Sequence, residues 1–457
     1  MSCRSQSSFY LDAMSAYHVV LKEFLVKNLY HCGTDNQSLL FINNRLDNRT
    51  TCLEWDKQLV GPIKDERGLE QGGTNSTDFY KVFGKEQVQS AQTSKLGVPL
   101  KNAVISALAQ ADDTILSSIS PNALQNLLQL TLNFCSKHHV QLCVEKTKLQ
   151  VMSTKSMKFE VEYLKTVSPI NIDGVKLEFV DNAEHVGIIR SIDGNLPNIL
   201  NRMSAHTKAL AAILHTGASR HHRGNPAANI KLDQVYGIPV LLSGLGALVL
   251  KKSEVETIDS HIRKTINNLM RLLPGTPRCV TYFLSGSLPG SALLHLRQFS
   301  LFGMICRLPS SILHNLATDV LTVPKRSPKS WFIQIRTLCL MYGLPHPLNF
   351  LENALTKTNF KKQIKKHVID YWEKKLRQEA SILPSLQFFH PEFMSLTSPH
   401  SILTTAGSSP YRVNMSTVQC HMISGRFRTE ALCSHWSLSN SKECTAPSSL
   451  MSRSRYH

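Results

Sequence analysis

Short apolar runs alternate with turn residues through the first third of the chain, whereas longer helical periods dominate the rest. Phe9-Tyr10-Leu11 and the runs at 104–108 and 115–116 are apolar enough to form buried strands. Residues 19–30 repeat their apolar positions with a helical period. The stretch from there to about Arg67 has no clear period, so we expect it to be irregular.

Glycine, proline and N-capping residues mark the next elements. Gly72-Gly73 allow a tight turn, and the Asn-Ser-Thr run at 75–77 predicts the start of a helix that continues to about Ala91. Ser120-Pro121 supplies an N-cap and a first-turn proline for another helix. One face of that helix is apolar and should be buried: Leu124, Leu127, Leu128, Phe134 and Cys135.

A strand is expected at 149–152, which gives the order strand, helices, β-hairpin, helix, strand. This is the order of a split βαβ sheet with a ferredoxin-like layout. In that layout the strand that ends at Asp12 lies beside the hairpin at 103–118, which carries Asp112 and Asp113 at its tip. Three carboxylates then converge at one end of the sheet, where they are well placed to hold Mg²⁺ against a nucleotide's phosphates. The alternative is a plain acidic turn.

The remaining chain divides into a small β unit, a helical region and a tail. Strands are expected at 161–164, 175–180 and 185–190, with a turn at Asp173-Gly174. From about 196 to 320 the pattern is mostly helical, and the apolar stretch 237–250 is a buried helix or strand pair, too short and interrupted to span a bilayer. Residues 323–329 predict a linker, a lysine-rich helix follows, and the Ser/Thr-rich chain after about 395 is expected to be disordered in places.

Charge narrows the class of partner. The 51 Lys and Arg residues exceed the 33 Asp and Glu residues by 18, which favours a polyanion such as nucleic acid. A ribosome-associated or membrane-surface protein would have the same composition. The 11 cysteines are scattered singly, mostly in apolar settings, and the N-terminus has no apolar signal segment. We therefore expect reduced, buried thiols in an intracellular protein.

In their order, these elements resemble the palm of a reverse transcriptase of the non-LTR (LINE-type, jockey-like) retrotransposon family. Five stretches correspond in turn to the family's motifs A to E: Asp12 with the aromatic Tyr17, Gln71-Gly72, Asp112-Asp113, Glu145-Lys146-Thr147, and His185-Val186-Gly187. The resemblance extends into later segments, including 204–210 and 294–304. It implies an α+β fold, a right-hand polymerase palm of ferredoxin-like type followed by a mostly helical thumb and C-terminal region.

The resemblance also implies site residues and cofactors. Asp12 and Asp112 would hold two Mg²⁺ ions, and Asp113 would complete the acidic cluster for two-metal nucleotidyl transfer. Tyr17 would block a ribose 2′-hydroxyl and so select deoxynucleotides; the alternative is a core aromatic, and the two roles are compatible. Gln71 would line the incoming nucleotide or the template, and Gly72 would let the backbone approach closely; the alternative is a plain helix-start turn. Lys146 would lie near the triphosphate, with a solvated surface lysine as the alternative.

The chain departs from the family pattern in several places. Only eleven residues precede Asp12, so we expect a truncated copy whose fingers and N-terminal endonuclease are missing and whose activity is impaired. His18 stands where the family usually has a second aspartate, and Gln110 where motif C usually has Tyr or Phe. Near the end, Cys433 and Cys444 follow what resembles the start of a zinc knuckle, but no competent zinc site is predicted.

Two basic segments are candidates for nucleic-acid binding. Arg220 and Arg223 flank a His-His pair in a compact basic loop, and Lys361 and Lys365 share one face of the lysine-rich helix. Solvated surface positions are the alternative for both segments.

Two hypotheses follow from the sequence. The chain is an RNA-directed DNA polymerase that uses an RNA template, a DNA primer and deoxynucleoside triphosphates, or it is a non-catalytic nucleic-acid-binding remnant of such an element. A translated fossil without function is a third possibility. No membrane partner is expected, the oligomeric state is open, and the location is nuclear or cytoplasmic. The predicted divisions are a palm at 1–190, a thumb-like domain at 191–322, a basic helical region at 323–395 and a tail at 396–457.

Overall fold

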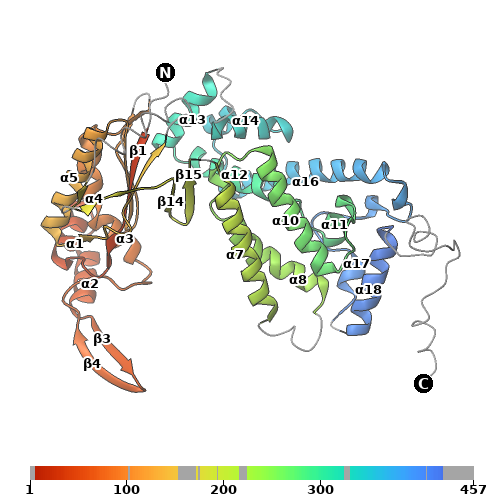
Figure 1. The fold of residues 1–457 in the computed structure, drawn as a ribbon, viewed down its shortest axis with the longest axis horizontal. Helices are drawn as coiled ribbons and strands as arrows, with labels where there is room; N and C mark the ends of the chain where they lie inside the picture. Colours follow the sequence, from red (N-terminus) through yellow and green to blue (C-terminus); the bar gives the residue numbers. More distant parts are fainter. Residues whose placement is uncertain are drawn as a thin grey trace. The chain divides into compact units, whose positions relative to one another are not determined.

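The computed structural model describes residues 6–100, 103–152, 171–172, 175–192, 194–215, 224–323, 330–407 and 409–425. Two compact units make up the chain, Met1–Asn198 and Ile199–His457. The first unit contains the sheets and the second is helical (Figure 1). Each unit is described by itself.

A five-stranded sheet forms the centre of the first unit, with the strand order β13-β10-β1-β8-β7. Its middle strand β1 pairs antiparallel with β10 on one side and with β8 on the other. The predicted neighbourhood of the Asp12 strand and the Asp112-Asp113 hairpin is therefore present. The strands are β1 Gln6–Leu11, β7 Ala107–Gln110, β8 Asp113–Ser118, β10 Lys148–Met152 and β13 Glu178–Phe179.

Alternation along β1 gives the sheet two buried faces. Phe9 and Leu11 join the cluster that contains leucines of helix α5 (Pro121–His138). Tyr10 points to the other face, where it packs with Ile115 and Ala183. The sheet is thus covered on both sides.

Helix α5 begins at the predicted proline and buries the predicted face. Leu124, Leu127 and Leu128 are fully buried, and Phe134 and Cys135 nearly so. The Ser120 hydroxyl makes no capping hydrogen bond. The apolar period, with the proline at the first position, is therefore what locates this helix.

The expectation of an irregular stretch between 31 and 67 is wrong. The chain there forms α2 (Asn36–Asp47) and the hairpin of β3 (Thr50–Trp55) with β4 (Gln58–Lys64). The helix predicted at 19–30 is present as α1 (Lys22–His31). Asp35 caps α2, because its side chain accepts hydrogen bonds from the backbone N–H groups of residues 37 and 38.

Two further expectations in this unit need correction. The helix predicted to reach Ala91 is divided at Gly84 into α3 (Ser76–Phe83) and α4 (Lys85–Thr93). The strand predicted at 185–190 is a hairpin, β14 with β15, because Val186 and Gly187 adopt positive φ angles of 50° and 68° and reverse the chain.

The smaller strands complete the first unit. The predicted strand at 161–164 and the turn at 173–174 lie outside the described residues. The other strands are β2 Ala13–Met14, β5 Val98–Leu100, β6 Ala103–Ile105, β9 Gln141–Leu142, β11 Asn171–Ile172, β12 Val175–Lys176, β14 Asn182–His185 and β15 Ile188–Ser191.

The second unit is helical, as predicted from 196 onward. Two of its helices, α10 and α12, pack against each other in the core. Its α-helices are α7 Leu196–His215, α8 Pro226–Leu232, α9 Ile238–Leu241, α10 Lys252–Met270, α11 Arg278–Ser285, α12 Gly290–Cys306, α13 Ile312–Thr322, α14 Trp331–Met341, α15 Pro347–Glu352, α16 Lys357–Ser381, α17 Ser401–Thr404 and α18 Pro410–Ile423. A π-helical turn at Asp233–Gly237 and 3₁₀ turns at Leu245–Ala247, Pro384–Leu386 and Pro391–Phe393 connect them.

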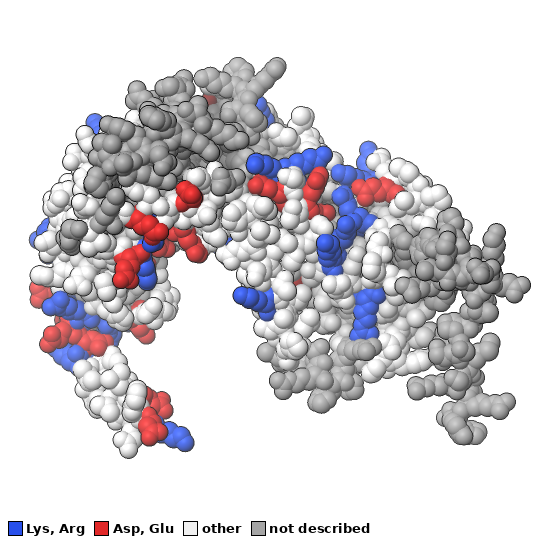
Figure 2. All heavy atoms as spheres, viewed as in Figure 1, with Lys and Arg blue, Asp and Glu red and all other residues white. Residues whose placement is uncertain are grey.

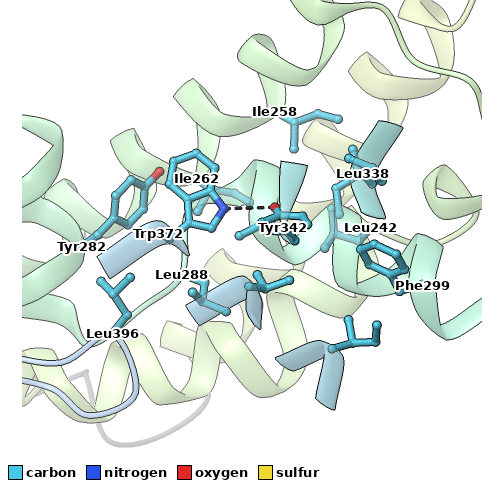
Figure 3. Close-up of a cluster of buried hydrophobic side chains, with 14 of the residues drawn as sticks. Leu242, Ile258, Ile262, Tyr282, Leu288, Phe299, Leu338, Tyr342, Trp372 and Leu396 are labelled. Atoms are coloured by element: carbon cyan, nitrogen blue, oxygen red, sulfur yellow. Dashed lines mark hydrogen bonds between the residues drawn. The ribbon is translucent and has the colours of Figure 1, made fainter. Parts of the chain in front are cut away.

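One large apolar cluster holds this unit together (Figure 3). Within it the Trp372 indole N–H donates to the Tyr342 hydroxyl over 3.1 Å, so the polar atoms of both rings are satisfied inside the core. The predicted lysine-rich helix is α16, and its buried positions recur every four residues from Phe360 to Ala380. Gly303 of α12 permits this packing, because a Cβ there would lie 2.6 Å from the Phe360 ring.

The tail and the thiols differ in part from expectation. Residues 396–425 lie in the tail that was expected to be partly disordered, yet α17 and α18 bury Leu403, Val413 and Cys420. Residues 426–457, with Cys433 and Cys444, lie outside the described part of the chain. Cys32 and Cys52 are exposed, whereas five other cysteines are buried. No helix among the described residues is both long and apolar enough to cross a bilayer.

Candidate active site

Strand pairing brings the predicted carboxylates to one end of the central sheet. Leu11, the last residue of β1, pairs with Thr114 of β8, so Asp12 and Asp113 follow as neighbours across the two strands. Gln110 pairs with Asp113 and leaves a two-residue turn, Ala111-Asp112. Ala111 has a φ of 55°, which places the Asp112 carboxylate at the hairpin tip. The sheet thus positions all three aspartates at the same end.

The electrostatics of Asp112 reflect its burial and the two neighbouring carboxylates. Burial raises the pKa of Asp112, and the negative charges of Asp113 and Asp12 raise it further. Figure 2 shows acidic side chains gathered on the visible face of the first unit. This concentration of negative charge would be relieved by a bound cation.

Lys146 is held over Asp12 by a tight local turn. The Cys143 N–H donates to the Asp12 carbonyl over 2.8 Å, and the Thr147 N–H donates to the Cys143 carbonyl over 2.8 Å. This turn places the Lys146 ammonium nitrogen 3.3 Å from Oδ2 of Asp12. The hydrogen bond and charge of Asp12 raise the pKa of Lys146. The side chain, predicted to lie near a triphosphate, therefore stands at the acidic cluster.

Tyr17 belongs to an aromatic pair beside Asp112. Its ring centroid lies 5.2 Å from that of Tyr80 on α3. Burial raises the pKa of Tyr80, and the charge of Asp112 adds to this effect, so Tyr80 lies near the hairpin tip. Sequence reasoning did not select Tyr80. Its place in the apolar period of the helix after Gln71-Gly72 was the available signal.

Gln71 and Gly72 lie in an exposed turn, and Gly72 has a φ of 88°. Among the described residues, no hydrogen bond or ion pair joins this turn to the three carboxylates. The stronger backbone constraint is at Gly68, where a Cβ would lie 2.9 Å from the backbone of His18. The Leu69 N–H donates to the Tyr17 carbonyl over 2.7 Å, so this segment fixes the turn that carries Tyr17.

His185, at the predicted motif E, lies against the other face of the sheet. Its ring centroid is 6.3 Å from that of Tyr10. Burial lowers the pKa of His185, and the nearby Asp113 charge opposes that shift. The start of the β14–β15 turn therefore lies close to the carboxylate end of β8.

The donor chemistry at this end suits Mg²⁺, which prefers carboxylate oxygens. In the described part of the chain, however, no three His, Cys, Asp or Glu side chains are gathered closely enough to hold a metal ion. The fit to divalent metal therefore rests on the donor type and on the unrelieved charge around Asp112.

The predicted nucleic-acid-binding residues fall in the second unit. Lys361 and Lys365 are exposed on α16, and the buried stripe of that helix faces the core. Arg220 and Arg223 lie outside the described residues, so their proposed role stays a prediction.

Residues 4–172 match the family model of the reverse transcriptase (RNA-dependent DNA polymerase). This segment contains the three aspartates, Tyr17, the Gln71-Gly72 turn and Lys146. No curated protein matches the chain. The match supports a reverse transcriptase domain in the first unit, and with it a nucleic-acid template, a primer and nucleotide substrates.

Proposed function

We propose that the chain is an RNA-directed DNA polymerase of the non-LTR retrotransposon type. The observation that carries this proposal is the pairing of β1 with β8, which sets Asp12 beside Asp112 and Asp113 within the matched segment. A palm with ferredoxin-like strand order agrees with this assignment. Intracellular action, in the nucleus or cytoplasm, is part of the proposal.

Each residue of the site has a distinct role. Asp12 and Asp112 would hold two Mg²⁺ ions, and Asp113 would complete the acidic cluster. When bound, the metal would supply charge stabilisation for attack by a primer 3′-hydroxyl and departure of pyrophosphate. Lys146 presents its ammonium group to the triphosphate, and its exposure leaves it free to exchange Asp12 for a phosphate oxygen. Tyr17, held against Tyr80, excludes a ribose 2′-hydroxyl.

Primer extension tests the proposal. The full chain is supplied with poly(rA)/oligo(dT), Mg²⁺ and dTTP, and is compared with Asp112→Asn, which keeps the side chain's size and removes its charge. If the native chain extends the primer and Asp112→Asn does not, the result supports polymerase activity at this site. Equal extension by both chains rules out Asp112 as a catalytic residue.

A second candidate is a nucleic-acid-binding protein without polymerase activity. The observation in its favour is the excess of 18 positive charges together with the exposed lysines of α16. Nucleic-acid binding by both chains, with extension by neither, would select this function.

A further inference from the structure

The β3–β4 hairpin is an exposed ribbon that carries large apolar side chains. Every residue of both strands is exposed. Trp55 is 81% exposed, and Leu53 and Val60 pair across the strands on the same face as Trp55. Burying such side chains normally stabilises a protein by about 1.5–3 kcal/mol each. Their exposure on one ribbon therefore indicates an interaction surface.

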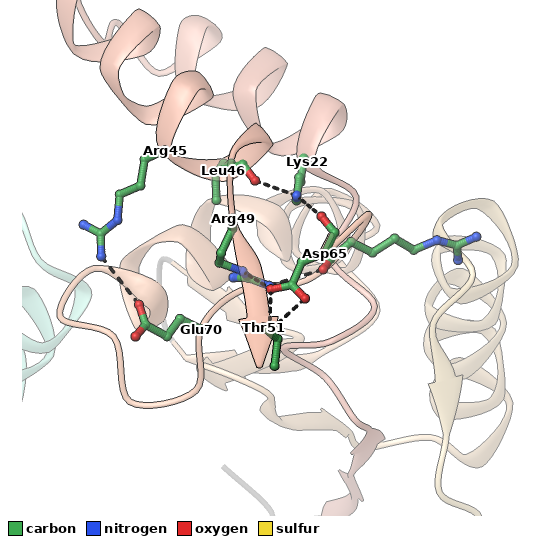
Figure 4. Close-up of polar contacts among 8 residues, drawn as sticks. Lys22, Arg45, Leu46, Arg49, Thr51, Asp65 and Glu70 are labelled. Carbon is green, nitrogen blue, oxygen red and sulfur yellow. Dashed lines mark hydrogen bonds and ion pairs between the residues drawn. The ribbon is translucent and has the colours of Figure 1, made fainter. Parts of the chain in front are cut away.

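A polar clamp fixes the base of this hairpin (Figure 4). The Asp65 carboxylate accepts hydrogen bonds from Arg49 Nε over 2.6 Å and from the Thr51 hydroxyl over 2.9 Å. The buried Lys22 ammonium of α1 donates to the carbonyls of Leu46 and Asp65. Because α1, α2, β3 and the residue that follows β4 share these contacts, the base of the ribbon is fixed.

The two edges of the ribbon differ. The turn Asp56-Lys57 is two residues long. The residues that flank such a turn, Trp55 and Gln58, hydrogen-bond to each other through their backbones. In the next pair along the ladder, Glu54 and Leu59 face each other without a backbone hydrogen bond. The N–H and C=O of Glu54 therefore point outward from β3. On the other edge, Pro62 supplies no N–H, so that edge is the poorer partner for a strand.

Charge argues against nucleic acid as the occupant. The hairpin carries Glu54 and Asp56 against Lys57 and Lys64, which cancel. In a chain with an excess of 18 positive charges, a neutral ribbon is where two copies can approach with the least repulsion.

We propose that β3 pairs antiparallel with β3 of a second copy of this chain, forming a four-stranded sheet across a two-fold axis. Edge strands are self-complementary, because each supplies both donors and acceptors. The contact is smaller than the roughly 800 Å² per partner of a stable interface, so the association is weak and concentration-dependent.

Two matched proline variants test the pairing edge. Glu54→Pro removes an outward N–H on β3 and leaves the hairpin's own ladder intact, and Leu59→Pro does the same on β4. In sedimentation velocity on the nuclease-treated full chain, Glu54→Pro should weaken self-association by at least about tenfold. Leu59→Pro should leave it unchanged. Monomeric native protein at all concentrations, or loss only in Leu59→Pro, overturns the proposal.

Cross-linking supplies a readout that does not depend on the proline variants. Cys52 is exposed near the middle of β3, so in an antiparallel pair of β3 strands centred on this residue the two Cys52 side chains lie opposite each other. Mild oxidation should give a disulfide dimer that Cys52→Ser abolishes and that Cys32→Ser retains, Cys32 being the other exposed thiol among the described residues. If both proline variants lose association, the cross-linking result decides whether β3 is the contact. A disulfide dimer that forms in the same yield in Cys52→Ser contradicts the β3 contact. Neither experiment uses polymerase activity, so its outcome is independent of the proposed function.

Discussion

The Lys146 ammonium nitrogen lies 3.3 Å from Oδ2 of Asp12, although the two residues are far apart in the sequence. The contact exists because the 143–147 turn hydrogen-bonds to the Asp12 backbone. Lys146 is 73% exposed at its side chain and Asp12 29%. Such a pair adds less than about 1 kcal/mol to stability, so its position is better explained by function than by folding.

Lys146→Ala should therefore impair nucleotide use without destabilising the fold. We expect the KM for dTTP to rise by about tenfold, because the charge-assisted contact that we propose between Lys146 and the triphosphate would be lost. Steady-state primer extension and urea unfolding measure the two effects. Lys148→Ala is the matched control, because Lys148 lies two positions after Lys146 in the sequence and forms its ion pair with Glu178 instead of Asp12. An equal rise in KM in both variants would mean that overall charge, and not Lys146, binds the nucleotide.

Gly237→Ala should disrupt a buried polar chain in the second unit. His206 Nε2 lies 2.8 Å from Asp233 Oδ1, and its Nδ1 lies 2.9 Å from His261 Nε2. A Cβ at Gly237 would lie 2.2 Å from Asp233 Oδ1. Breaking a buried pair of this kind costs about 3–5 kcal/mol, which urea unfolding would detect.

Gly84→Ala is the control for that substitution. Its added Cβ would lie 3.5 Å from the Tyr80 carbonyl, an ordinary contact, and Gly84 has a negative φ. We expect a change of less than about 1 kcal/mol. A Gly237→Ala chain as stable as the Gly84→Ala chain would show that the π-helical turn yields easily.

The sequence was informative wherever one face of an element is buried. Helix α5 and helix α16 show a clear apolar period because each lies with one side on a core. The order of elements predicted the neighbourhood of Asp12 and the Asp112-Asp113 hairpin, because β1 and β8 are buried runs. These features follow from local pattern plus chain order.

Elements without a buried face gave no such signal. The β3–β4 hairpin is exposed on both faces, so its residues do not alternate, and its Asp56-Lys57 turn lacks glycine. The turn at Val186 places a β-branched residue at positive φ, against its local preference. Tyr80 reaches the site only through tertiary packing on Tyr17. Long-range contacts that decide these features cannot be inferred from periodicity.

The second unit should lose stability in mild acid through His295. Tyr342 accepts the Trp372 N–H, so its own proton goes to Nδ1 of His295, 2.8 Å away, and the imidazole must be neutral. Burial lowers the pKa of His295 from 6.5 to about 4. Between pH 6.5 and about pH 4 the unfolded chain therefore binds a proton at His295 that the folded chain does not bind. Stability is fully present above about pH 6.5 and falls as the pH drops toward 4, by about 3 kcal/mol in all.

Urea unfolding at pH 7 and at pH 4.5 measures this loss. His295→Gln removes the titrating group, so its stability should change less between the two pH values than that of the native chain. The difference isolates His295, because other histidines titrate alike in both chains. His31→Gln, at an exposed position of α1, should keep the native pH dependence. An unchanged dependence in His295→Gln would place the acid sensitivity elsewhere.

The exposed lysines of α16 should contribute to nucleic-acid binding through phosphate contacts. Neutralising four of them to glutamine should reduce the slope of log K against log salt for RNA, by up to about 0.9 for each lost contact on a duplex and about 0.7 on a single strand. The positions are Lys361, Lys362, Lys365 and Lys366, all outside the buried stripe of the helix, so the fold should be retained.

The control removes the same charge from exposed lysines of the first unit: Lys27, Lys57, Lys64 and Lys95. Fluorescence anisotropy at several salt concentrations gives the slope for each chain. A slope that falls equally in both sets would mean that binding follows total charge, and an unchanged slope in the α16 set would mean that these lysines are only solvated.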